Sequence, residues 1–144
     1  MFSKLNGSKK NLELWRSFRK SSADCSVDEI VRGFNTEPDK IRYIDYYTPD
    51  SWPNVFEIVT EQMFCQSGIS LILGATLHNL QLIKTNFLRF DVISNHITGT
   101  EGLVLFENNL YHNFLPGEIH TVEAVKNNAT IFESHIITVD KLFD

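Results

Sequence analysis

Three residues that could act together in thiol chemistry follow one another along the chain: Cys65, His96 and Asn113. A thiol attacks a carbonyl carbon as its thiolate, so it needs a base to take its proton and a further group to orient that base. An imidazole is a suitable base near neutral pH. The three residues therefore predict a thiol hydrolase or transferase. In it Cys65 attacks, His96 takes and returns the proton, and Asn113 holds the imidazole.

Cys65 stands just before the first turn of a segment with helical spacing. Backbone N–H groups and the helix dipole favour an anion there, which lowers the pKa of a thiol. The other interpretation is structural, because free cysteine is among the most buried residue types. His96 and Asn113 likewise stand where polar residues often end a strand or form a turn. The residue types alone leave both interpretations open.

The layout of residues 56–117 resembles that of the papain-like and transglutaminase-like cysteine hydrolases. In that family a Cys begins a helix packed on an antiparallel sheet, a His on a following strand is the base, and an Asp or Asn on the next strand orients it. The matching stretches are 64–68, 94–98 and 110–114. The resemblance implies a site at Cys65, His96 and Asn113. The family's His usually opens the strand that enters the hairpin, whereas this strand opens with Glu101-Gly102, so an inactive site is also compatible.

A second group of residues is typical of a binding surface. Tyr and Trp bury large areas while keeping one polar tip, and acidic side chains between them would suit a basic protein partner. The aromatic residues are Tyr43, Tyr46, Tyr47 and Trp52, and the acidic ones are Asp45, Asp50, Glu57 and Glu61. An adaptor or immunity-like binding domain is therefore the main functional prediction, with the thiol enzyme as its alternative. The rings could equally pack between helices and sheet.

Composition excludes several classes of protein. The chain has 13 Lys and Arg against 18 Asp and Glu, a net charge of −5, which disfavours nucleic-acid binding. The two cysteines and five histidines show no metal-ligand spacing, so we expect no metal and no cofactor. We find no signal peptide and no apolar run long enough to span a membrane, which predicts a cytoplasmic protein. The exposed edges of a small sheet also allow a homodimer.

The periodicity predicts which elements must position these residues. A capping box formed by Ser26 and Glu29 begins one helix, and residues 69–80 form an apolar central helix. After residue 85 the period changes to two, which indicates strands. The expected helices are 12–20, 27–34, 53–63, 69–80 and 121–127, and the expected strands are 40–47, 88–92, 102–107, 110–115 and 130–139. We therefore predict a flexible segment 1–10 and one α+β domain, 11–144, with the helices on an antiparallel sheet of four to five strands.

Overall fold

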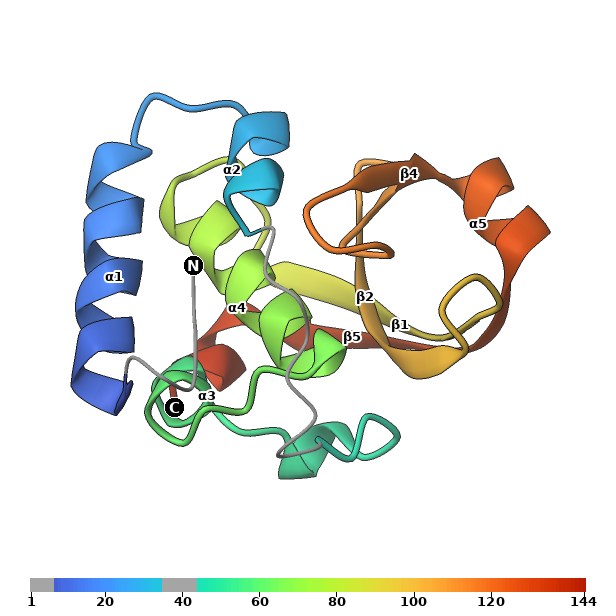
Figure 1. The fold of residues 1–144 in the computed structure, drawn as a ribbon, viewed down its shortest axis with the longest axis horizontal. Helices are drawn as coiled ribbons and strands as arrows, with labels where there is room; N and C mark the ends of the chain where they lie inside the picture. The colour runs from blue at the N-terminus through green and yellow to red at the C-terminus, as the bar shows by residue number, and fades with distance from the viewer. Residues whose placement is uncertain (1–6, 35–43) are drawn as a thin grey trace.

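The computed structural model describes residues 7–34 and 44–144 of the chain. Helices form the first part and an antiparallel sheet the second, so the α+β prediction is confirmed (Figure 1). The helices are α1 (Gly7–Ser21), α2 (Val27–Gly33), α3 (Val55–Thr60), α4 (Gln66–Asn79) and α5 (Val122–Asn128), with short 3₁₀ turns η1 (Pro49–Ser51) and η2 (Val139–Leu142). The strands are β1 (Phe87–Asn95), β2 (Thr100–Glu107), β3 (Leu110–His112), β4 (Ile119–Thr121) and β5 (Ala129–Thr138).

Side-chain caps fix where the short helices begin. The predicted capping box of Ser26 and Glu29 is present at α2, and Asn54 and Glu57 form a second one at α3. Thr121 caps α5 by accepting a hydrogen bond from the amide of Ala124. Each cap satisfies amide groups that have no partner inside the helix. α1 begins at Gly7, so residues 7–10, which we expected to be flexible, are helical.

α4 lies at the centre of the molecule, between the N-terminal helices and the sheet (Figure 1). Residues 67–77 of this helix are all buried, as expected for a helix that is apolar around most of its circumference. Trp15 of α1 is also buried, and its indole N–H donates to Thr76 Oγ1 at 2.9 Å. The apolar helix is thus covered on one side by helices and on the other by strands, which fixes the position of its N-terminal end.

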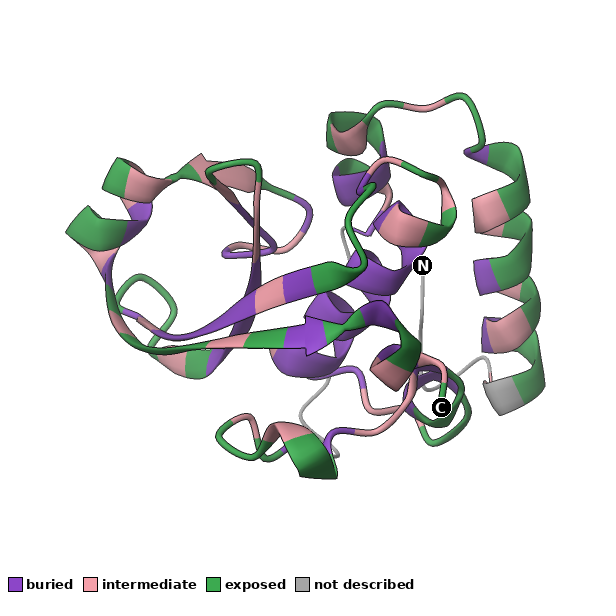
Figure 2. Cartoon of the chain, turned by 180° about the vertical axis from the view of Figure 1, so that it is seen from behind, coloured by how far each residue is buried: buried purple, intermediate pink, exposed green. Residues whose placement is uncertain are grey.

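The five strands have the order β4-β3-β2-β1-β5, and all their pairings are antiparallel. Asn108 and Asn109 join β2 to β3 with φ values of 52° and 61°, the two successive positive angles of a type I′ hairpin. Phe90 and Leu105 of the sheet belong to the main core with α4, whereas the smaller core of Val104 and Tyr111 lies on the opposite face. The second face is only partly covered, and its edge strand β5 has exposed residues along most of its length (Figure 2).

Two expectations about the strands were wrong. Residues 44–47 are not in a strand, although we predicted one over 40–47; residues 40–43 lie outside the described part of the chain. β-branched and aromatic residues favour strands, but packing decides, and Ile44 belongs to the main core. Strand β4 was not expected, because Pro116-Gly117 reads as the end of the sheet. It is instead a turn, after which the chain returns along β3.

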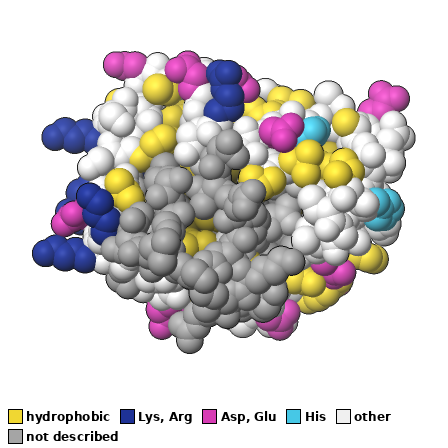
Figure 3. Space-filling model, in the orientation of Figure 1, with side chains coloured by type: hydrophobic (Ala, Val, Ile, Leu, Met, Phe, Trp, Pro, Cys, Tyr) yellow, Lys and Arg dark blue, Asp and Glu magenta, His cyan; other side chains and the backbone are white. Residues whose placement is uncertain are grey.

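Charge is unevenly spread over the surface. α1 carries Lys9, Lys10, Arg16, Arg19 and Lys20 against one acidic residue, Glu13. Figure 3 shows Lys and Arg side chains gathered on the side of the molecule where α1 lies. The net charge of −5 is therefore the sum of a basic helix α1 and a more acidic rest of the chain. Among the helices of the described residues, none has the length and apolar character needed to cross a membrane.

Candidate functional site at the N-terminal end of α4

The first turns of α4 occupy the edge of β2 at the point where β3 separates from it. β3 pairs with β2 only from Leu105 onward. Beyond that point side chains of α4 bond to the backbone of β2. The amide of Leu103 donates to Ser67 Oγ at 3.0 Å, and Ser70 Oγ donates to the carbonyl of Leu103 at 2.7 Å. Both serines are buried. Two hydroxyl groups of a helix therefore satisfy backbone groups that a strand would otherwise pair.

Asn113 connects the end of β3 to the same turns of α4. Its Nδ2 donates to Ser70 Oγ at 3.0 Å and to the carbonyl of Gln66 at 3.4 Å. In return, Gln66 Nε2 donates to the carbonyl of Asn113 at 3.0 Å. Asn113 is 3% exposed and has a φ of 75°, a left-handed conformation that asparagine tolerates better than most residues. We call Gln66, Ser67, Ser70, Leu103 and Asn113 the α4 junction.

Cys65 lies at the N-cap position of α4, next to this junction. The predicted position before the helix is therefore observed, with a φ of −67° and a ψ of 169°. Its side chain makes no capping hydrogen bond. It is 8% exposed and is part of the main hydrophobic core. The thiol thus faces apolar neighbours and has little contact with solvent.

His96 lies elsewhere, beyond the end of β1 and beside β5. Its Nε2 is 3.0 Å from Thr130 Oγ1, and its amide donates to the carbonyl of Asn128 at 2.8 Å. The residue is exposed. Within residues 7–34 and 44–144, no hydrogen bond joins His96 to Cys65 or Asn113. The structure brings Cys65 and Asn113 to the same turn of α4, but it does not bring the imidazole to them.

Gly102, the third residue of β2, lies beside the first turn of α4. A Cβ atom built on it would lie 3.0 Å from Ser67 Oγ and 3.6 Å from Gln66 Cβ. A side chain at this position would therefore point at the start of the helix. The residue that the resemblance implies as the base, His96, lies elsewhere, and Gly102 has no side chain.

The α4 junction has polar groups but no acid or base. Its polar side chains are amides and hydroxyls, which hold their protons near neutral pH. Sequence reasoning missed Ser67, Ser70 and Gly102. Ser67 and Ser70 are three residues apart on one face of an apolar helix, a spacing that could have indicated a polar contact there.

The predicted aromatic surface is only partly on the surface. Trp52 is 7% exposed; its Nε1 donates to the carbonyl of Asp45 at 3.0 Å, and its ring packs edge-on against Phe90. It therefore offers a partner little area. Tyr46 is half-buried, and Tyr47 is exposed and donates its hydroxyl to Glu101 at 2.8 Å. That hydrogen bond is the main cause that raises the pKa of Tyr47 to about 12. Tyr43 lies outside the described residues.

The acidic residues near these rings are already engaged within the chain. Asp45 accepts hydrogen bonds from Thr48 and from the amide of Tyr47. Asp50 pairs with Lys141 at 3.0 Å, and Glu57 belongs to the capping box of α3. These carboxylates stabilise turns and helix ends, so they would have to serve a basic partner in addition to these structural roles.

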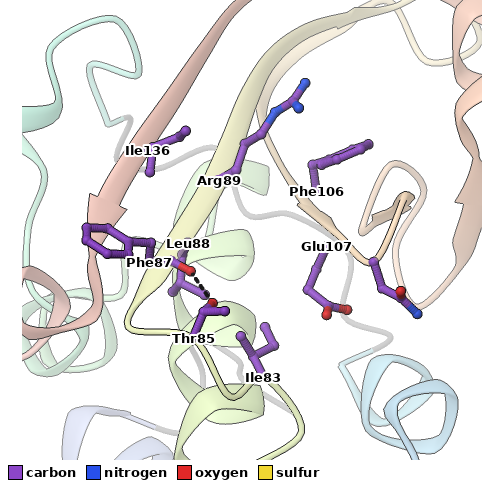
Figure 4. A pocket seen from close by; sticks show the side chains of 9 residues that line it. Ile83, Thr85, Phe87, Leu88, Arg89, Phe106, Glu107 and Ile136 are labelled. Carbon is purple, nitrogen blue, oxygen red and sulfur yellow. Dashed lines mark hydrogen bonds between the residues drawn. The ribbon is translucent and has the colours of Figure 1, made fainter.

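A second polar cluster lies on the other face of the sheet. Asp91 is fully buried; Arg89 binds both its oxygens, at 2.9 and 3.0 Å, and the hydroxyl of Tyr111 donates to it at 2.6 Å. Burial and this hydrogen bond raise the pKa of Tyr111. Arg89 also lines a cavity of about 280 Å³ with Phe106 and Ile136, which come from adjacent strands (Figure 4). The charges of Arg89 and Asp91 compensate each other, so this cluster is structural.

Comparison with known proteins gives a result for the fold alone. Neither a family model nor a curated protein matches the sequence. Among solved structures, Legionella pneumophila LapG is similar with a TM-score of 0.62 and 17% identity, over 89% of this chain and 74% of LapG. Its calcium-bound form has a TM-score of 0.61, with 17% identity over 89% and 75%, and its EGTA-treated form 0.62, with 17% identity over 89% and 73%.

The similarity to a calcium-bound structure raises the question of a metal site in this chain. In the part of the chain that the structure describes, no group of three or more His, Cys, Asp or Glu side chains is placed to hold a metal ion. What the comparisons establish is a fold shared with LapG.

Proposed function

We propose that this chain is a non-catalytic domain with the fold of the transglutaminase-like cysteine hydrolases. LapG is a cysteine protease of this type. The shared fold therefore favours the thiol-enzyme alternative over the adaptor. The α4 junction is the observation that supports a non-catalytic domain. Beside the start of the helix this chain has Gly102, which has no side chain, and Asn113 donates to Ser70 Oγ rather than to an imidazole. Such a domain acts through non-covalent contacts.

The surroundings of Cys65 support the same conclusion. A cysteine thiol acts as a nucleophile after it has lost its proton, which in a thiol enzyme a nearby base takes. Cys65 is in the apolar core and makes no capping hydrogen bond. The position is thus that of a reactive cysteine, but the surroundings are those of a core residue.

The second candidate is a thiol hydrolase that uses Cys65, His96 and Asn113. One observation favours it, the location of Cys65 at the N-cap of the central helix in a fold shared with LapG. Catalysis would require His96 to leave Thr130 and approach the junction. A basic protein partner for the Tyr46–Tyr47 surface stays a prediction.

Alkylation of the two cysteines in the folded protein distinguishes these candidates. Cys25 is partly exposed and Cys65 is buried, so Cys25 is an internal control. For a non-catalytic domain, iodoacetamide modifies Cys25 in the native protein and Cys65 only after unfolding in urea. Modification of native Cys65 faster than Cys25, read by mass spectrometry of peptides, would contradict the proposal and favour the thiol enzyme.

A further inference from the structure

The outer edge of β5 is the longest unpaired strand edge of the sheet. β5 has ten residues, and among residues 7–34 and 44–144 it pairs only with β1. In an antiparallel ladder every second residue directs its N–H and C=O away from the partner strand, so this edge presents a row of free backbone groups. Natural edges are usually protected by lysine, proline or a bulge. β5 has no lysine or proline, and it has one irregularity, opposite Val92 and Ile93.

Exposed apolar side chains gather beside this edge. Six large hydrophobic residues are exposed in the described chain, and three of them are Phe87 at 60%, Phe132 at 50% and Ile136 at 68%. Ile136 pairs with Arg89, and Phe87 pairs with Thr138, so Ile136 and Phe87 lie on the same face of the sheet. Figure 4 shows Ile136 and Phe87 side by side at the rim of the cavity. Apolar surface concentrated next to an open edge is typical of an interaction site.

The sequence of β5 is complementary to itself when read in the opposite direction. With Ser134 opposite Ser134, Glu133 faces His135 and Phe132 faces Ile136. Beyond Glu133 the bulge at Phe132 shifts the register, so Ile136 faces the bulge and Thr130 does not pair with Thr138. Opposite-charge and apolar pairs are cross-strand combinations that stabilise antiparallel sheets. Centring the pairing one residue further along, at His135, would place Glu133 opposite the buried Ile137.

We infer that β5 pairs with β5 of a second copy of this chain, around a two-fold axis at Ser134, to give a continuous sheet of ten strands. A two-fold axis places the same surface on both subunits, so self-complementarity is what such an interface requires. The irregularity at Phe132 leaves residues 133–138 as regular strand. The central pairs of Glu133, Ser134 and His135 lie at its start. Ile136 of one copy is then enclosed between its own Arg89 and Phe132 of the other copy.

Sedimentation of the full chain tests the dimer. We expect a concentration-dependent monomer–dimer equilibrium in the micromolar range. Ile136→Lys should weaken the dimer about tenfold or more, because it places a charge opposite Phe132 at the axis-related position. Ile97→Lys is the matched control, since Ile97 is 57% exposed and lies outside β5; it should leave the equilibrium unchanged. A protein that stays monomeric, or a dimer that Ile136→Lys does not weaken, would overturn the inference.

Disulfide cross-linking tests the register independently of stability. In a Cys25→Ser background, Ser134→Cys places two cysteines opposite each other, about 4.5–5.5 Å apart between Cα atoms, within reach of a disulfide. Thr138→Cys places them eight positions apart, about 27 Å. We expect oxidation to link the Ser134→Cys dimer and not the Thr138→Cys dimer. The reverse result, or a dimer in which neither links, would contradict this register.

Discussion

Substitution of Asn113 by aspartate separates a structural role from a catalytic one. In a catalytic triad, aspartate can orient a histidine as well as asparagine does. In the α4 junction it cannot replace the amide, because Asn113 donates two hydrogen bonds, to Ser70 Oγ and to the carbonyl of Gln66. The Ser70 hydroxyl already donates to the carbonyl of Leu103. A carboxylate at position 113 would therefore face acceptor oxygens.

The size of the effect follows from these contacts. Each buried polar group left without a partner costs about 1–3 kcal/mol, and the change removes both donors of a side chain that is 3% exposed. We expect Asn113→Asp to lower the free energy of unfolding by about 2–4 kcal/mol at neutral pH. The pKa of the new carboxyl is raised in the folded state, because only the protonated form can donate to Gln66. The loss should therefore be small at low pH and grow as the pH rises through that pKa.

Urea denaturation at several pH values measures this change, and the m-value reports whether unfolding stays two-state. Asn109→Asp is a matched control, because Asn109 also has a positive φ of 61° but is exposed in the hairpin turn. It should change stability by less than about 0.5 kcal/mol. The reasoning is refuted if Asn113→Asp is as mild as Asn109→Asp, or if its effect does not depend on pH.

Three further predictions follow from buried groups. Asp91→Ala leaves Arg89 and Tyr111 without their shared partner and should cost about 3 kcal/mol in urea denaturation, whereas Asp28→Ala, which breaks the exposed pair with Arg32, should cost less than about 0.5 kcal/mol. Burial lowers the pKa of His112, so stability should fall as the pH drops below about 6.5, the ordinary pKa of histidine. His112→Gln should flatten that fall, and an unchanged pH profile would show that His112 does not cause it. Gly68→Ala brings a Cβ into contact with the carbonyl of Met63, and a thermal melt should show a loss of about 2–3 kcal/mol; wild-type stability would mean that the loop before α4 can shift freely.

Local sequence signals were sufficient for much of the fold. The capping box of Ser26 and Glu29, the apolar spacing of residues 69–80 and the Asn108-Asn109 turn each specify a local structure through contacts within a few residues. Strand β4 depends on pairing with β3 across a Pro-Gly turn, which no local pattern encodes. The same holds for Ile44, where burial in the core outweighs strand propensity.

The site was harder to predict because its geometry depends on long-range contacts. Chain order placed Cys65 at the start of α4, as predicted. Asn113 was expected within a strand over 110–115, but β3 ends at His112 and Asn113 follows it with a positive φ. The direction of the His96 side chain could not be predicted. It depends on Thr130 of β5, which follows His96 by more than thirty residues. Gly102 and Ser70 become important only once α4 is packed against the edge of β2.

The pH dependence of Cys65 alkylation, compared between the wild-type chain and His96→Ala, tests most directly whether an imidazole acts on this thiol. A non-catalytic domain predicts that native Cys65, which is buried, reacts slowly at every pH and that His96→Ala leaves the curve unchanged. A fast reaction below neutral pH that disappears in His96→Ala would contradict this account and establish a thiolate–imidazole pair.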